Sequence, residues 1–231
     1  MVLPAYGRSD RMGEEKLWAR VSGRTVLQLT LAAVRAASVF DSVVVVASRD
    51  RWRDVTELAR LEGLCGVNVV EGGERRQDSV RMGLAVCHDL DHVCVHDAAR
   101  PLCPPRLFRD VLEAARHHGA ATAAVGQVDT IKRVHDGVVL ETPERSSLVA
   151  VQTPQAFETS LIIAAHDIAR EEGFTADDDC TLVERIGHSV RIVAGEQRNF
   201  KVTRPLDLII LRHLVGRSRS HSGSRSRDRP R

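Results

Sequence analysis

The chain has 231 residues, of which 33 are lysine or arginine and 31 are aspartate or glutamate, so its formal net charge is +2. With 43% hydrophobic and 28% charged residues it can bury a sizeable core, which excludes a wholly disordered chain. No apolar run approaches the roughly 20 residues of a membrane span, and the N-terminus lacks the pattern of a signal peptide. Five irregularly spaced cysteines without a C-x-x-C pair favour free thiols in a reducing cytosol over a disulfide framework or a zinc site. We therefore expect a cytoplasmic protein.

Short β-branched runs alternate with helical patterns over about the first 125 residues. The strand-like runs are continuously apolar, which is typical of a parallel sheet covered on both faces; they lie at 42–47, 67–70 and 92–96. Between them, apolar residues at helical spacing predict helices at 25–37, 51–61 and 78–88. The alternation predicts an α/β fold with a doubly wound, mostly parallel sheet.

The pattern changes near Gly126. Thr130–Val134 and Val138–Leu140 are typical of two short strands, and Asp136 and Gly137 between them suit the positive φ of a tight hairpin turn. A hairpin inserted between α/β units has little sheet of its own to join. We therefore interpret residues 126–148 as a protruding arm that finds its partner on another subunit; the alternative is an antiparallel edge extension within the same chain.

The α/β rhythm resumes at 149–152 and ends with a predicted helix at 206–215, so residues 1–215 form the expected domain. The last 16 residues, 216–231, hold six arginines, five serines and one aspartate, and we expect them to be disordered. Such a tail could bind RNA, but we favour a solvated extension. Without the tail the body carries a net charge of −3, so the excess positive charge is poor support for a nucleic-acid partner.

Ligands of an open parallel sheet bind beyond the carboxyl ends of its strands. The loop at 5–16, after the first predicted strand, has small residues and two glycines that let backbone amides approach an anion, while Arg11 and Lys16 add positive charge. It lacks the Gly-Lys-Ser/Thr of a P-loop and the Gly-x-Gly-x-x-Gly of a dinucleotide site. On its own, a glycine-rich surface turn explains this loop equally well.

Two further loops carry similar signals. Paired glycines, Gly72 and Gly73, precede Ser79, which either approaches a ligand or caps a helix. Asp97 leaves the strand at 92–96, a usual place for a carboxylate that holds Mg²⁺, although it could simply pair with Arg100.

Lysine is scarce in this chain: there are only Lys16, Lys132 and Lys201. Lys201 lies in a segment that we expect to be a strand returning to the same edge before the final helix. Lys16, Asp97 and Lys201 would then converge, and two lysines, a carboxylate and glycine turns suit a polyphosphate with its metal. No Ser-His-Asp triad or supported Cys-His pair is present in the sequence.

These segments together resemble the 2-C-methyl-D-erythritol 4-phosphate cytidylyltransferase family over about residues 2–215. The His-Asp-Ala-Ala-Arg-Pro run at 96–101 and the Thr-Pro-Gln run at 153–155 are the most specific parts. The other matching segments are 4–16, 72–80, 129–132, 178–179 and 201–208. The resemblance implies a Rossmann-like nucleotidyltransferase fold and a reaction that moves a cytidylyl group from CTP to methylerythritol phosphate with release of pyrophosphate.

The resemblance also implies roles for individual residues. Arg11 and Lys16 would grip the CTP triphosphate, and Lys201 would act near the α-phosphate; these three are the expected catalytic residues. Asp97 would hold Mg²⁺, the expected cofactor, or the substrate hydroxyls. The nucleotide would be bound around Ala5, Tyr6, Gly7, Gly73 and Ser79.

The second substrate would be held by Asp97, Arg100, Thr130, Arg145, Thr153 and Gln155. In the family the arm embraces a second subunit, so Thr130 and Arg145 would reach the neighbour's site in a homodimer. The expected partners are therefore CTP, an alditol phosphate and a second copy of the chain, without membrane or nucleic acid.

Three departures from the family pattern concern the site or its sheet. The first strand is cut to Val2 and Leu3, Tyr6 replaces a residue that is usually small, and Asp177 stands where the family often has Thr. Tyr6 would either narrow the base pocket or turn outward. Two rival functions remain: a cytidylyltransferase for another alditol phosphate such as ribitol 5-phosphate, and a catalytically inactive nucleotide-binding regulator.

Overall fold

A seven-stranded sheet forms the centre of the computed structural model, which describes residues 1–6 and 16–222. In sheet order its strands are β11 (Arg191–Ala194), β7 (Ala120–Gly126), β10 (Val149–Glu158), β6 (His92–Val95), β1 (Val2–Pro4), β4 (Val44–Ala47) and β5 (Asn68–Glu71). β10 runs antiparallel to β6 and β7, and the other pairings are parallel. The sheet is therefore mostly parallel, as the apolar runs predicted.

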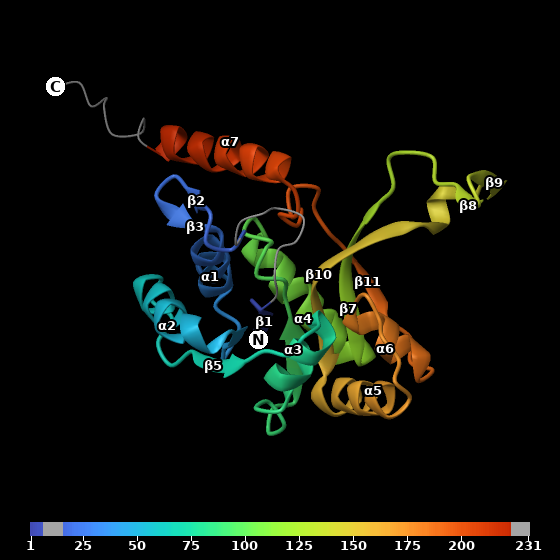
Figure 1. Cartoon of the computed structure of the whole chain (residues 1–231), viewed down its shortest axis with the longest axis horizontal. Coiled ribbons are helices and arrows are strands. Elements are labelled where there is room, and N and C mark those ends of the chain that lie inside the picture. Colours follow the sequence, from blue (N-terminus) through green and yellow to red (C-terminus); the bar gives the residue numbers. More distant parts are fainter. Residues whose placement is uncertain (7–15, 223–231) are drawn as a thin grey trace.

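Helices cover both faces of this sheet (Figure 1). One core cluster joins it to α1 (Val26–Ala37), α2 (Trp52–Leu61) and α4 (Pro105–His118). A second joins the opposite face to α3 (Arg76–Leu84), α5 (Thr159–Glu171) and α6 (Asp179–Arg185). Successive residues of β1 point to opposite faces of the sheet, so Leu3 packs in the first cluster and Val2 in the second. The doubly wound arrangement is confirmed, and the predicted helices at 25–37, 51–61 and 78–88 correspond to α1, α2 and α3.

The predicted hairpin arm projects away from the sheet in Figure 1. Its strands, β8 (Arg133–His135) and β9 (Val138–Glu141), form a separate two-stranded sheet, and a single-turn helix, η2 (Arg145–Ser147), follows them. Asp136 and Gly137 have φ values of 48° and 77°, which confirms the expected turn. β7 and β10 pair from the sheet out to Gly126 and Val149, and so form the base of the arm. The arm is thus no edge extension of the main sheet.

The last described helix, α7 (Pro205–Ser222), packs beside the small hairpin β2 (Arg20–Val21) and β3 (Arg24–Thr25) through a third apolar cluster. It begins near the predicted position but continues past Val215, so helix extends into the segment expected to be disordered. Residues 223–231 lie outside the described residues, and their expected disorder stays a prediction. Across the described part of the chain, no helix is both long and apolar enough to cross a membrane.

Candidate active site

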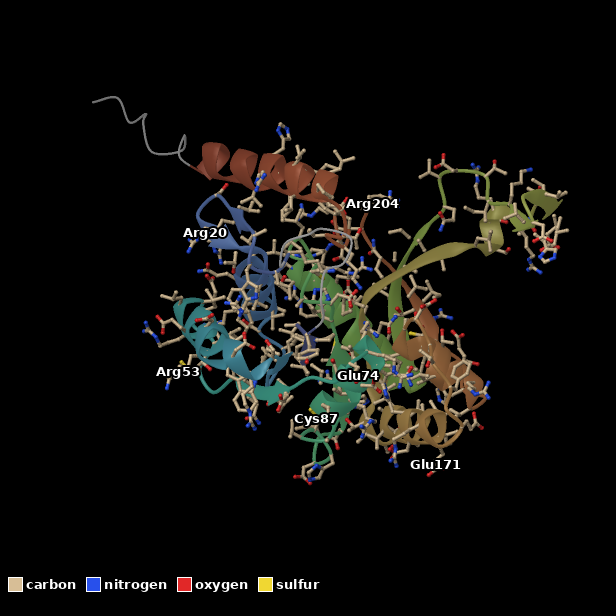
Figure 2. The ribbon with its side chains drawn as sticks, in the orientation of Figure 1. Arg20, Arg53, Glu74, Cys87, Glu171 and Arg204 are labelled. Atoms are coloured by element: carbon tan, nitrogen blue, oxygen red, sulfur yellow. The ribbon has the colours of Figure 1, made fainter. Side chains whose placement is uncertain are left out.

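The described parts of the predicted site loops lie at the carboxyl edge of the sheet. Glu74 and Cys87, labelled in Figure 2, flank the two ends of α3, and Glu74 belongs to the loop that leaves β5 at this edge. Lys201 lies in the loop between β11 and α7, so the strand that we expected around it is absent. The loop still reaches the edge, because the Val202 amide donates to the Ala99 carbonyl at 2.8 Å.

Three cations surround the carboxylate of Asp97, which is only 6% exposed. Arg76 Nε lies 3.2 Å from Oδ1, while Arg100 Nε at 3.3 Å and Lys201 Nζ at 3.1 Å share Oδ2. Burial disfavours the charged form, but the attraction of Lys201, Arg76 and Arg100 outweighs it and holds the pKa of Asp97 well below its usual range. The pairing of Asp97 with Arg100 exists, but as one part of a larger cluster.

Arg76 also joins Asp97 to a second buried carboxylate, that of Asp179. Arg76 Nη2 lies 2.9 Å from Asp179 Oδ2, and Nε2 of buried His166 lies 3.1 Å from Oδ1. Although burial opposes ionisation, Arg76 and His166 keep the pKa of Asp179 below its usual value. Arg76 and Asp179 were not predicted as site residues. Both lie inside segments that match the family, at 72–80 and 178–179, and this was the available signal.

A buried polar network fixes the Asp97 backbone. The Asp97 amide donates to Thr153 Oγ1 at 2.9 Å, and the Thr153 hydroxyl lies 3.0 Å from His96 Nδ1. His96 Nε2 lies 3.2 Å from the Arg100 carbonyl, which can only accept, so this nitrogen carries the proton and Nδ1 accepts from Thr153. Burial lowers the pKa of His96 to about 4. His96 is therefore a neutral structural link between the two ends of the Asp97–Arg100 turn.

Two residues expected at the second substrate are buried among internal partners. Thr153 is 4% exposed and serves the network just described. Gln155 is fully buried; its Oε1 accepts from the Asp179 amide at 3.2 Å and its Nε2 donates to Asp178 Oδ2 at 3.1 Å. Asp177, the departure beside them, is exposed. The structure brings Thr153 and Gln155 beneath the ion cluster, and direct contact with substrate stays a prediction for both.

The glycine loop after β5 is held by Ser79. The Gly73 amide donates to Ser79 Oγ at 3.2 Å, and the serine is fully buried. A side chain on Gly73 would begin 2.4 Å from Asp78 Cβ, so only glycine fits there. α3 begins at Arg76, with Arg75 as its N-cap, so the alternative in which Ser79 caps the helix is wrong.

The loop after β1 is described only at its two ends. Ala5 and Tyr6 leave the strand at the site edge, whereas Gly7 and Arg11 lie outside the described residues. Lys16 is half-buried in the turn before β2. This turn is linked to α1, because the Leu27 amide donates to the Leu17 carbonyl at 3.0 Å. α1 also supports the Asp97 loop, because Thr30 Oγ1 donates to the Ala98 carbonyl at 2.7 Å.

The arm, whose segment 126–148 contains Thr130 and Arg145, projects away from the sheet (Figure 1). Both are exposed, and Arg145 Nη1 donates to the Val128 carbonyl within the arm at 3.0 Å. The structure thus brings together Asp97, Arg100 and Lys201, but not Thr130 and Arg145 of the same chain.

Comparison with known proteins decides the family. The family model for 2-C-methyl-D-erythritol 4-phosphate cytidylyltransferase matches residues 1–217. The chain belongs to this family. A relative of that name from Bacillus cereus is 39% identical over 215 residues, which cover 91% of this chain and 94% of the relative. Another, from Pelotomaculum thermopropionicum, is 42% identical over 220 residues, or 93% and 92% of the two chains.

Solved structures of the family share the fold. The crystal structure of 4-diphosphocytidyl-2C-methyl-D-erythritol synthase from Anaerococcus prevotii matches with a TM-score of 0.83 at 28% identity, over 93% of this chain and 96% of that one. The 2-C-methyl-D-erythritol 4-phosphate cytidylyltransferase of Thermus thermophilus gives 0.77 at 35% identity, over 94% and 98%. The resemblance drawn from the sequence motifs is therefore confirmed.

Removing the Arg76 guanidinium should destabilise the fold strongly. The Arg76→Gln variant leaves two buried carboxylates without their shared partner, and we expect a loss of about 3–5 kcal/mol in the free energy of unfolding at pH 7, measured with urea. Both carboxylates have depressed pKa values in the folded state, so their stabilisation is present above the unfolded pKa of about 4 and is lost as pH falls below it. The difference between wild type and variant should therefore shrink below about pH 4.

The adjacent Arg75→Gln variant is the matched control for this experiment. Arg75 pairs with Asp78 in a more exposed position, and its replacement should cost much less. Equal losses for the two variants, or a difference between Arg76→Gln and wild type that grows on acidification, would contradict the assignment.

Proposed function

We propose that this chain catalyses attack of the phosphate of 2-C-methyl-D-erythritol 4-phosphate on the α-phosphorus of CTP. The products are 4-diphosphocytidyl-2-C-methyl-D-erythritol and pyrophosphate. Family membership supports the reaction. The main structural support for this reaction is the cluster of Lys201, Arg100 and Arg76 around Asp97 at the carboxyl edge. The cluster concentrates positive charge where polyphosphates bind in such sheets.

The chemistry needs no general base. The attacking phosphate is already an anion; one of its oxygens bonds to the α-phosphorus while the bond to the bridging oxygen of the β-phosphate breaks, and pyrophosphate carries away the electron pair. Catalysis then consists of aligning two anions and stabilising the charge that develops between them. His96 fits this requirement, since it is neutral and both of its ring nitrogens are engaged by Thr153 and Arg100.

We assign Lys201 to the α-phosphate and the incoming phosphate. The Lys201 side chain is 34% exposed. Its ammonium group can therefore move from the Asp97 carboxylate to a substrate oxygen without opening a cavity in the protein. Lys16, in the turn before β2, and Arg11 would hold the rest of the triphosphate. A compact ammonium on a flexible stem suits a group that must follow a moving phosphate, whereas the guanidinium of Arg76 stays fixed between two carboxylates.

We propose Mg²⁺ as the cofactor, bound mainly by substrate. The described residues contain no group of three or more side chains that could cage a metal. An ionised Asp97 at the edge fits a cation that uses one carboxylate together with phosphate oxygens. When bound, Mg²⁺ would neutralise part of the triphosphate charge. Asp97 would supply the protein ligand, while Arg76 and Arg100 keep that carboxylate in place.

We further propose that two copies of the chain complete each other's sites. Apolar side chains on the arm are exposed, among them Val134, Val138 and Leu140 at 59–64%. An apolar surface of this kind is typical of an interface, and the projecting arm would carry Thr130 and Arg145 to the methylerythritol phosphate of the neighbour. We also propose a cytoplasmic enzyme, in keeping with its five free thiols.

Turnover by the purified chain tests the reaction. With CTP and Mg²⁺ we expect pyrophosphate release that depends on methylerythritol phosphate and stops when Mg²⁺ is chelated. Lys201→Ala and Lys16→Ala should each lower the rate by roughly 10²- to 10³-fold, because each removes a cation from the developing charge. Arg60→Ala, in an exposed pair with Glu57, is the control and should leave the rate unchanged.

Turnover with ribitol 5-phosphate alone would show that the chain acts on another alditol phosphate. A folded chain that binds CTP without turnover on either substrate would show a nucleotide-binding regulator. Wild-type rates in both lysine variants would remove the roles assigned to them.

Mixing two inactive variants tests the shared site. In a dimer of Lys201→Ala with Arg145→Ala, one site receives both defects and the other receives an intact Lys201 together with an intact arm. We therefore expect the mixture to recover turnover that neither variant has alone, measured after subunit exchange. No recovery in mixed dimers, or a monomer by light scattering at working concentration, would contradict this proposal.

A further inference from the structure

Tyr6 occupies a distinctive place beside the site. The Ala5 amide donates to the Val46 carbonyl at 2.8 Å, so the chain leaves β1 next to the end of β4. β4 lies between β1 and β5, and β5 leads into Gly72 and Gly73. A side chain that runs from Tyr6 toward Gly72 must therefore pass over the carboxyl end of β4.

The contact between Tyr6 and Gly72 shows that the side chain does so. A Cβ on Gly72 would lie 2.3 Å from Tyr6 Cγ, 2.5 Å from its Cβ and 2.7 Å from its Cδ2, so the base of the ring rests directly on the glycine backbone. The neighbouring Gly73 is in turn held by buried Ser79. Tyr6 nevertheless remains 37% exposed, so part of an aromatic ring with a rigid support is open to solvent.

The order of the strands separates the Tyr6 ring from Asp97. Tyr6 and Gly72 lie on the side of β1 that faces β4 and β5, whereas Asp97 and Arg100 follow β6 on the other side. Arg76, from the start of α3, and Lys201, from the loop before α7, contact the Asp97 carboxylate there. A nucleotide along this edge would place its triphosphate at the cations and its base at the ring. Aromatic rings are favourable stacking surfaces for bases, and a supported ring loses little freedom on binding.

We propose that the ring of Tyr6 stacks against the cytosine base of CTP and thereby contributes to the affinity of the site for the nucleoside part of the molecule. The proposal rests on the function proposed above. It makes Tyr6 a residue that binds the base through its side chain, and Gly72 the position that must lack a side chain to admit the ring.

Equilibrium binding of CTP and of inorganic tripolyphosphate to Tyr6 variants tests this role. Tyr6→Ala should weaken CTP binding roughly tenfold, as expected for the loss of one base stack, and leave tripolyphosphate binding unchanged. Tyr6→Phe keeps the ring and should stay close to wild type. Tyr6→Leu keeps apolar bulk over Gly72 without a ring; it should lose most of the same affinity, and it replaces Tyr6→Ala if that variant does not fold.

Three results would overturn the proposal. Unchanged or tighter CTP binding by Tyr6→Ala would mean that the ring does not contact the base or occupies its place. An equal loss for CTP and tripolyphosphate would mean that Tyr6 only shapes the loop. A wild-type chain that does not bind CTP would overturn the proposed function as well, whereas the first two results would leave that function intact.

Discussion

The carboxylate of Asp97 and the three cations around it constrain the rest of the site. An ionised group at this depth costs several kcal/mol unless it is paired, so the elements that carry its partners must meet at one point. Arg76 comes from the start of α3, and Lys201 from the loop before α7. Through Asp179, the same guanidinium reaches α6 and the His166 side chain of α5. The ion pairs that stabilise the buried Asp97 carboxylate therefore link elements from both halves of the chain.

This arrangement explains how a site for anions can be assembled before an anion binds. Like charges that would otherwise repel one another are held at the edge by the two carboxylates, and the hydrogen bonds of Thr153 and His96 fix the turn that carries one of them. Phosphate oxygens can then replace Asp97 as the partner of Lys201, the most exposed of the three cations. Substrate binding would replace the Lys201–Asp97 ion pair by a Lys201–phosphate pair, while Arg76 would keep its contacts with Asp97 and Asp179.

The sequence predicted most of the architecture because the relevant signals are local. Continuous apolar runs marked β4, β5 and β6, and the Asp136-Gly137 turn marked the arm. The contact between Arg76 and Asp179 could not be predicted in this way, because it depends on how α3 and α6 pack on the same face of the sheet. The 33 basic and 31 acidic residues allow many pairings, and composition does not show which of these residues are buried.

Other features followed from tertiary contacts that no local pattern encodes. Lys201 reached the edge on a loop, because a backbone bond to Ala99 replaced the expected strand pairing. Tyr6 could be recognised as unusual for its family, but only the structure revealed its contact with Gly72. Helix α7 continues to Ser222, beyond Val215, where the apolar pattern ends. The prediction from composition therefore ended the helix too early.

A crystal structure with CTP and Mg²⁺ would show whether Lys201 exchanges Asp97 for the substrate. We predict that Lys201 Nζ, which lies 3.1 Å from Asp97 Oδ2 in the free chain, moves to a phosphate oxygen while Arg76 keeps its contacts with Asp97 and Asp179. A complex in which Lys201 remains on Asp97 and the triphosphate binds away from this cluster would contradict it.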